Sequence, residues 1–151
     1  MRSKVTNFYN CICSYVDYDL FALSETWLSD DICNNELFPS DIVVYRKDRN
    51  FKNLQVSKGG GVLLGIRDKY KSTAMDLTSI TSIIPTVDII GAKVTDTHES
   101  LIVLCVYIPP RINFQDFELL FELISTLNTF SNSKIMLLGD FNVPEFTLGI
   151  V

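Results

Sequence analysis

The chain has 151 residues, of which 47% are hydrophobic, and its formal net charge is −5. This length and hydrophobic content predict one domain with a buried core and argue against two full domains. The negative charge argues against broad electrostatic binding to a nucleic-acid backbone. The longest apolar run, Leu101–Ile108, is too short to cross a bilayer, and no signal peptide is evident. We therefore expect an intracellular protein, cytoplasmic or nuclear.

The first predicted element is a helix over residues 4–16, where apolar residues recur at helical spacing. Two of the four cysteines, Cys11 and Cys13, fall within it, and their spacing favours core packing over a shared metal. Leu20–Ser24 follows as a short buried strand, and Glu25 comes where that strand should end. The helix and strand together predict the start of a layered α/β domain.

Residues 42–45 predict a second strand, and residues 62–66 predict a third that follows the glycine run Gly59–Gly61. The glycines indicate a positive φ or a close backbone approach. A phosphate cradle is the alternative, but no helix start and no Lys-Ser/Thr pair follow the run.

Five basic residues lie between the second and third strands with only Asp48 opposing them, and they predict a loop that could contact nucleic acid locally: Arg46, Lys47, Arg49, Lys52 and Lys58. A solvated loop is the more common meaning of such a run.

Residues 87–95 and 101–108 are β-rich runs that predict a hairpin, with His98 in its turn. Apolar residues at intervals of three and four then predict a helix over 113–130. A buried strand over 134–139 completes the pattern and ends next to Asp140 and Asn142. Strands outnumber helices, so we expect an α/β layer structure with mixed sheets.

Glu25 and Asp140 each follow an apolar strand, so both carboxylates are expected at strand ends. Carboxylates held at the mouth of a buried strand suit an oxygen-ligating ion such as Mg²⁺. Acidic residues after strands are also common in turns and at helix N-termini, so position alone leaves both interpretations open.

Four sequence blocks narrow this choice because of their order and spacing: Ser24–Leu28 (Ser-Glu-Thr-Trp-Leu), the glycine run before residues 62–66, Val106–Pro110 (Val-Tyr-Ile-Pro-Pro), and Leu138–Asn142 (Leu-Gly-Asp-Phe-Asn). The ordered set extends over nearly the whole chain and resembles the endonuclease/exonuclease/phosphatase superfamily. Within that superfamily, the chain is most similar to the endonuclease domain of non-LTR (LINE-type) retrotransposon polyproteins, which also carry a reverse transcriptase.

The resemblance implies a four-layer α/β/β/α sandwich of two mixed β-sheets flanked by helices. It implies a Mg²⁺-dependent DNA endonuclease, with Mn²⁺ as a possible substitute. Glu25 matches the family's metal-ligating glutamate, and Asp140 matches the aspartate that orients or deprotonates the attacking water. Asn142 and Tyr107 match residues that contact the same phosphate.

The family's first strand, which bears an asparagine, and its C-terminal Ser-Asp-His block have no counterpart in the sequence. His98 precedes Asp140, whereas the family's catalytic histidine follows it, so we do not expect His98 to replace it. Residues 1–151 are therefore expected to form a partial, incomplete domain with weak or no activity alone and weak nucleic-acid binding. The alternatives are a non-catalytic remnant or interaction module on the same scaffold, and a relative that hydrolyses another phosphoester.

Overall fold

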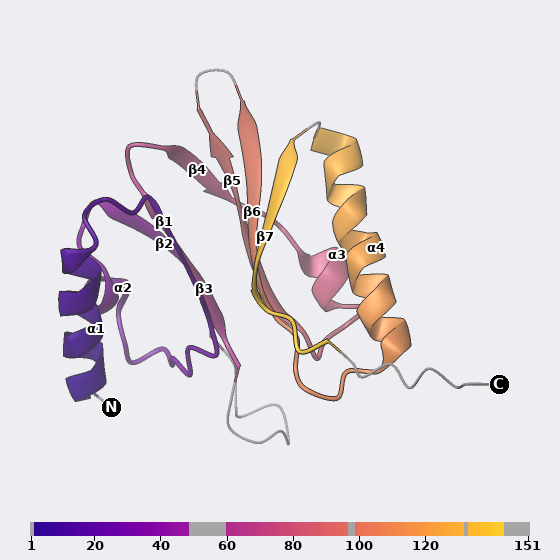
Figure 1. The fold of residues 1–151 in the computed structure, drawn as a ribbon, viewed down its shortest axis with the longest axis horizontal. Helices are drawn as coiled ribbons and strands as arrows, with labels where there is room; N and C mark the ends of the chain where they lie inside the picture. Colours follow the sequence, from indigo (N-terminus) through magenta and orange to yellow (C-terminus); the bar gives the residue numbers. More distant parts are fainter. Residues whose placement is uncertain (1, 49–59, 97–98, 132, 144–151) are drawn as a thin grey trace.

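The computed structural model describes residues 2–48, 60–96, 99–131 and 133–143. Two β-sheets pack face to face, and helices cover the outer face of each sheet (Figure 1). The helices are α1 (Arg2–Ser14), α2 (Asn34–Leu37), α3 (Thr78–Thr81) and α4 (Phe114–Ser131). The strands are β1 (Leu20–Ser24), β2 (Ile42–Lys47), β3 (Val62–Arg67), β4 (Lys71–Ala74), β5 (Asp88–Thr95), β6 (Ser100–Tyr107) and β7 (Lys134–Asp140).

The first sheet has three strands in the order β1-β3-β2, and both pairs are antiparallel. Its central strand, β3, is almost completely buried because it has a strand on each side and a packed layer on each face. The register pairs Ser24 with Val62 and Lys47 with Val62, so β1 and β2 end where β3 begins.

The second sheet has four strands in the order β4-β5-β6-β7 and is mixed. β5 and β6 form the antiparallel hairpin, and the register pairs Asp88 with Tyr107. After α4 crosses the outer face, β7 returns parallel to β6 and pairs Asp140 with Tyr107. A crossover helix is what a parallel connection requires.

Three apolar clusters hold the four layers together. One lies between the sheets and includes Leu64, Val103 and Cys105. A second joins the second sheet to α3 and α4, and a third joins the first sheet to α1 and α2. Each predicted amphipathic helix therefore buries its apolar stripe against a sheet, which is the main source of helix stability in globular proteins.

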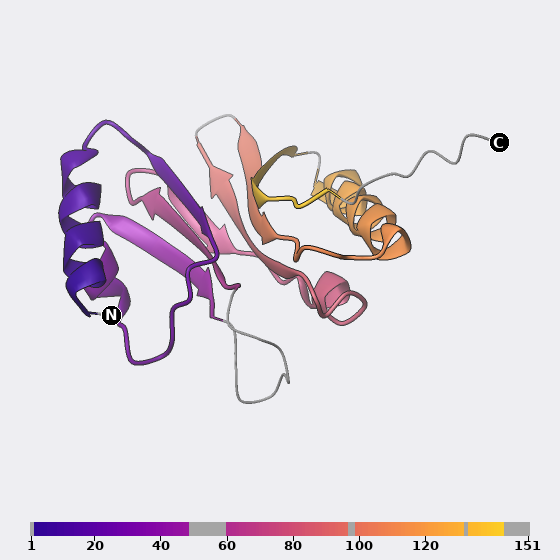
Figure 2. The same cartoon turned by 60° about the horizontal axis from the view of Figure 1, so that its bottom comes forward.

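The strand registers bring several chain segments to one end of the sandwich. The hydrogen bond from the Gly61 amide to the Asp88 carboxylate joins the start of β3 to the start of β5. The ends of β1, β2, β6 and β7 consequently meet there, at the bottom of Figure 1 and toward the viewer in Figure 2. We call this the lower end and the opposite end the upper end.

The α/β four-layer architecture expected from the sequence is confirmed, as are both long helices and the hairpin. The three-stranded sheet is antiparallel in the described residues, and only the other sheet is mixed. The prediction missed α2, α3 and β4, which have four residues each and are too short to display a periodicity.

Two predictions of burial were wrong. Residues 134–139 form an edge strand of the described sheet, with Met136 40% exposed, because β7 is paired only through β6. Cys11 and Cys13 are exposed rather than packed in the core, because α1 turns other residues, such as Ile12, toward the sheet. Among the described residues, no helix combines the length and the apolar character needed to span a membrane.

Candidate functional site

Glu25 lies at the lower end, directly after β1, in an unusual backbone conformation. Its φ is 52°, and that of Trp27 is also 52°, in the left-handed region that non-glycine residues rarely adopt. The intervening backbone is held in place because the Thr26 amide donates to the Gly61 carbonyl (3.2 Å) and the Trp27 amide donates to the Gly60 carbonyl (3.1 Å). These bonds fix where the exposed Glu25 side chain leaves the strand.

The glycines that accept these bonds are themselves left-handed, with φ of 88° at Gly60 and 85° at Gly61. Glycine adopts such angles without steric cost, which explains the residue type. The Gly61 amide donates to Asp88 Oδ2 at 2.9 Å. Because these groups bind within the protein, the geometry does not favour the phosphate-cradle alternative; Gly59 lies outside the described residues.

The tip of β7 carries the second candidate carboxylate, Asp140. The preceding Gly139 has a φ of +131°, and a Cβ atom there would collide with the Val106 carbonyl oxygen. The close approach of β6 and β7 therefore requires glycine before Asp140. The Asp140 carbonyl also accepts a hydrogen bond from the Ile108 amide at 2.9 Å, which continues the pairing to the strand tip.

Asn142 follows two residues later and turns back toward β6. Its φ is 36°, and its Nδ2 donates to the Ile108 carbonyl at 3.0 Å. Asparagine tolerates this left-handed conformation better than most residues. The contact fixes the plane of the side-chain amide at the exposed lower end.

Tyr107, Asp140 and Asp88 occupy paired positions on neighbouring strands, so their side chains leave the same face of the second sheet. Tyr107 belongs to the cluster between the sheets, as does Leu138, two residues before Asp140. The side chains of Tyr107, Asp140 and Asp88 therefore face the first sheet. Since β1 contacts both β6 and β7, Glu25 and Asp140 extend from strands that touch across the sandwich.

The burial of these residues differs. Glu25 and Asn142 are exposed, and Asp140 is partly buried. Tyr107 is only 4% exposed, because its ring packs between the sheets. A buried tyrosine ring contributes mainly packing, and its hydroxyl is the group that can make a polar contact.

The donor chemistry at the lower end fits a hard cation. The candidate ligands are carboxylate and amide oxygens, which Mg²⁺ prefers. Within the described ranges, no three Asp, Glu, His or Cys residues cluster closely enough to form a complete metal cage. Mg²⁺ commonly binds through one or two carboxylates and completes its coordination with water and substrate phosphate. The residues present therefore fit Mg²⁺ better than a metal ion that needs three or more protein ligands.

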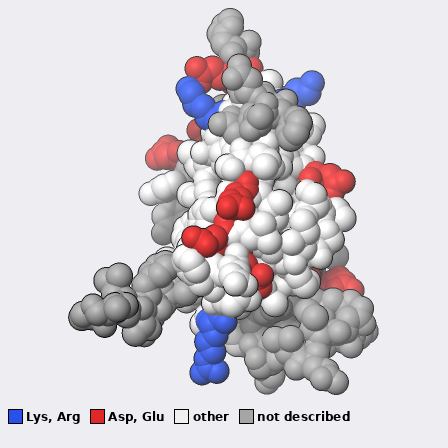
Figure 3. Space-filling model, turned by 90° about the vertical axis from the view of Figure 1, so that its right-hand side faces the viewer, with Lys and Arg blue, Asp and Glu red and all other residues white. Residues whose placement is uncertain are grey.

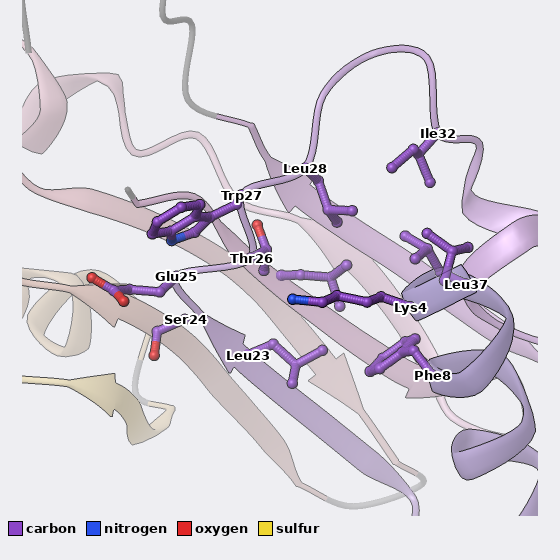
Figure 4. Close-up of a pocket in the computed structure, with 12 residues that line it drawn as sticks. Lys4, Phe8, Leu23, Ser24, Glu25, Thr26, Trp27, Leu28, Ile32 and Leu37 are labelled. Carbon is purple, nitrogen blue, oxygen red and sulfur yellow. The ribbon is translucent and has the colours of Figure 1, made fainter. Parts of the chain in front are cut away.

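A cavity of about 740 Å³ lies behind Glu25, between α1 and the outer face of the first sheet. Its lining is mainly apolar and includes Phe8, Leu23 and Leu63, and Trp27, which is 43% exposed, also lines it. In Figure 4 the Glu25 carboxylate points away from Phe8 and Leu23. Of the four candidate residues only Glu25 lines this cavity; Asp140, Asn142 and Tyr107 do not.

The predicted basic loop is only partly described, and its first two residues differ from the prediction. Arg46 and Lys47 belong to β2. Arg46 donates to the carbonyls of Ile32 (2.7 Å) and Ser29 (3.1 Å), and Lys47 lies 3.6 Å from Asp88 Oδ1. Both cations therefore serve internal contacts. Arg49, Lys52 and Lys58 lie outside the described residues, as does His98.

The outer face over α4 is unsuited to a phosphate backbone. The helix carries Asp116, Glu118 and Glu122 and no lysine or arginine. Figure 3 shows acidic side chains spread over this side of the molecule, with basic ones only at its margins. The described residues of this face therefore disfavour binding of a phosphate backbone.

Asp88 is the lower-end residue that sequence reasoning missed. It is 5% exposed, bonds to Gly61 and lies beside Lys47. The available signal was a charged residue at the start of the apolar run 87–95, where burial of a carboxylate requires a partner. The sequence could not identify that partner, which comes from the other sheet.

No protein-family model and no curated protein sequence matches the chain. Solved structures do. A humanized Danio rerio TDP2 with 14 mutations superposes with a TM-score of 0.59 at 12% identity, over 95% of this chain and 58% of that chain. D. rerio TDP2 complexed with a single-strand DNA product gives 0.57 at 12% identity, over 90% and 54%. The human Nocturnin catalytic domain with bound sulfate gives 0.59 at 14% identity, over 95% and 57%.

The chain spans a little over half the length of these structures. At such low identity the likeness shows the fold alone. These neighbours have the endonuclease/exonuclease/phosphatase fold, so the scaffold implied by the four sequence blocks is confirmed.

Proposed function

We propose that residues 1–151 form part of a Mg²⁺-dependent phosphodiester hydrolase, a DNA endonuclease domain derived from a non-LTR retrotransposon. The main support is the convergence of two strand tips, those bearing Glu25 and Asp140, at the lower end of the sandwich. The order of the four sequence blocks supports the proposed origin from a non-LTR retrotransposon.

Glu25 is the proposed metal ligand, because its exposed carboxylate leaves a backbone segment fixed by two hydrogen bonds. A fixed carboxylate binds a cation with less loss of side-chain entropy than a mobile one. When bound, Mg²⁺ would neutralise charge that develops on the scissile phosphate; Mn²⁺ would serve in the same role.

Asp140, Asn142 and Tyr107 are proposed to act on the opposite side of the phosphate. Asp140 would orient or deprotonate the attacking water, because its carboxylate is held at a strand tip and faces the first sheet. Asn142 would bind a phosphate oxygen, since its amide plane is already fixed by Ile108. Tyr107 would contribute at most its hydroxyl, because its ring is buried.

DNA is the proposed substrate, and the affinity is expected to be weak. One structural neighbour is a complex with a single-strand DNA product. The net charge of −5 and the acidic outer face oppose strong backbone binding. Recognition would therefore depend on the bound cation and a few local contacts, and it should weaken as salt concentration rises.

Calorimetric titration of Mg²⁺ tests the metal site. We expect one saturable site, with its affinity reduced at least about 10-fold in Glu25→Gln. Glu118→Gln is the matched control, since Glu118 is an exposed glutamate on the outer helix α4. Equal affinity in the wild type and Glu25→Gln would exclude Glu25 as a ligand.

Nicking of supercoiled plasmid tests the reaction. With Mg²⁺ we expect slow nicking by the wild-type chain, abolished by Asp140→Asn and unchanged by Glu118→Gln. A general base commonly contributes about 10²- to 10⁴-fold to rate, so its loss should remove a weak activity. Nicking by the wild type at a measurable rate that Asp140→Asn leaves unchanged would remove Asp140 from the mechanism.

A non-catalytic interaction module is the second candidate. Its support is the acidic charge and the internal use of Arg46 and Lys47, which leaves less positive surface for DNA. Such a module predicts no Mg²⁺ site at all. Saturable Mg²⁺ binding that is lost in Asp140→Asn would contradict it.

A further inference from the structure

Asp88 is a charged residue buried at the lower end without an assigned purpose. It begins β5 and is 5% exposed. A carboxylate removed from water is strongly unfavourable unless hydrogen bonds or an opposite charge compensate. Here Oδ2 accepts the Gly61 amide at 2.9 Å, and Oδ1 lies 3.6 Å from Lys47 Nζ. The carboxylate therefore connects the two sheets.

The contact with Gly61 leads directly to Glu25. Gly61 accepts the Thr26 amide, and Gly60 accepts the Trp27 amide. Residues in left-handed conformations persist only where their surroundings constrain them. The left-handed Glu25 therefore depends on a glycine backbone that Asp88 holds from the other sheet.

Asp88 is also linked to the second candidate carboxylate. It pairs in register with Tyr107, and Tyr107 pairs with Asp140, so the three residues form one row across β5, β6 and β7. The contact from this row to Gly61 sets the spacing between the sheets at the lower end. Any group held between Glu25 and Asp140 depends on that spacing.

We propose that Asp88 is a positioning residue that fixes the Glu25 carboxylate relative to Asp140 through its hydrogen bond to Gly61. The proposal rests on the proposed function, because it concerns the same metal site. Outer residues that orient metal ligands commonly change metal affinity 10- to 100-fold when mutated, although they do not touch the metal.

Two substitutions separate geometry from charge. Asp88→Asn keeps the side-chain length and an oxygen that can accept the Gly61 amide, but it loses the charge. Asp88→Glu keeps the charge but moves the oxygens by one methylene. Positioning predicts that Asp88→Glu weakens Mg²⁺ binding by about 10-fold, with a smaller loss in Asp88→Asn. A purely electrostatic role predicts the reverse order.

The experiment measures Mg²⁺ affinity by calorimetry and amide resonances by ¹H–¹⁵N NMR for the whole chain. In Asp88→Glu we expect shifted amide signals at Gly61, Thr26 and Trp27, and in Asp88→Asn signals closer to those of the wild type. Asp41→Ala is the control, because it removes an ion pair with Arg67 at the upper end of the first sheet. It should leave Mg²⁺ affinity and these three signals unchanged.

The NMR readout keeps this proposal separate from the proposed function. If the wild type binds no Mg²⁺, the proposed function fails, and the amide shifts still decide whether Asp88 positions the Glu25 segment. Unshifted Thr26 and Trp27 signals in Asp88→Glu would overturn positioning. Mg²⁺ affinity reduced more in Asp88→Asn than in Asp88→Glu would overturn it as well.

Discussion

The two ends of the sandwich are built from the same strands but stabilised in different ways. Among the described residues, all seven with positive φ lie at the lower end: Glu25, Trp27, Gly60, Gly61, Arg111, Gly139 and Asn142. The upper end instead has ion pairs on partly or fully exposed side chains, such as Lys69 with Asp19 and Lys134 with Glu99. Strained backbone and a buried carboxylate thus collect where the candidate residues lie.

This difference indicates that the upper end serves as scaffold and that the lower end carries the candidate site. Exposed ion pairs contribute little to stability and tolerate replacement. Left-handed non-glycine residues cost about 1–3 kcal/mol each and persist only where surrounding contacts enforce them. The concentration of left-handed residues at the lower end supports a functional role for that end.

Gly139→Ala should produce the largest effect. A Cβ atom there would meet the Val106 carbonyl oxygen, and φ is +131°, so both backbone and neighbour must shift. We expect a loss of about 3 kcal/mol in the free energy of unfolding. Urea denaturation measures it.

Gly91→Ala, on β5 of the same sheet, is the matched control. Its added Cβ would lie 2.6 Å from the Leu104 Cδ2 atom, the end of a flexible side chain, so a loss of about 1 kcal/mol is expected. Equal losses in the two variants would show that the β7 tip is no more constrained than the rest of the sheet.

Glu25→Gly should have a smaller effect of opposite sign. The exposed side chain contributes little packing, and glycine removes the penalty of the left-handed φ. We expect the free energy of unfolding to rise by about 0.5–1 kcal/mol while Mg²⁺ binding is lost. Chemical denaturation with parallel calorimetry tests both.

Glu118→Gly gives the comparison for that result. Glu118 is an exposed glutamate within α4, where glycine should destabilise by about 1 kcal/mol. If both glycine variants lost stability to the same extent, the idea of strain at Glu25 would be wrong.

The smallest effect is expected from the upper-end pair of Asp19 and Lys69. The hydrogen bond from Lys69, and then that from Tyr70, lowers the pKa of Asp19, while the bond to Asp19 raises the pKa of Lys69. A lowered carboxyl pKa contributes stability above its unfolded value that is lost as pH falls below about 4. The raised lysine pKa contributes below about pH 10 and is lost above it.

NMR titration of the Asp19 carboxyl carbon measures this shift. In Lys69→Gln we expect the pKa of Asp19 to move toward its ordinary value but stay below it, because the Tyr70 hydroxyl still donates at 2.9 Å. High salt should reduce the Lys69 contribution in the wild type. A pKa unchanged by both treatments would contradict the assignment of Lys69 as the main cause.

Much of the fold could be predicted because it depends on local patterns. The helical spacing of apolar residues predicted α1 and α4, and apolar or β-rich runs predicted β1, β2, β3, β5, β6 and β7. The short elements α2, α3 and β4 escaped prediction, since four residues cannot display a period. Burial of β7 was overestimated, because an apolar run does not reveal how many neighbours its strand will have.

The candidate residues were likewise found only where a strand end or a family motif marked them. Glu25, Asp140, Asn142 and Tyr107 satisfied that condition, and their roles stay predictions. Asp88 did not, because its partners Gly61 and Lys47 are 27 and 41 residues away along the chain. Contacts between two sheets leave no periodic signal in either segment.

Local sequence patterns were enough to predict the class of fold, the strand ends that bear carboxylates, and the positive φ or close approach of the glycines before β3. Periodicity and residue type are local properties of the chain, and they do not depend on how the two sheets pack. That these strand ends meet at one end, and that Arg46 and Lys47 make contacts within the protein, became evident only from the packing of the two sheets. Those outcomes depend on the packing of two sheets, which brings residues that are distant in the sequence into contact.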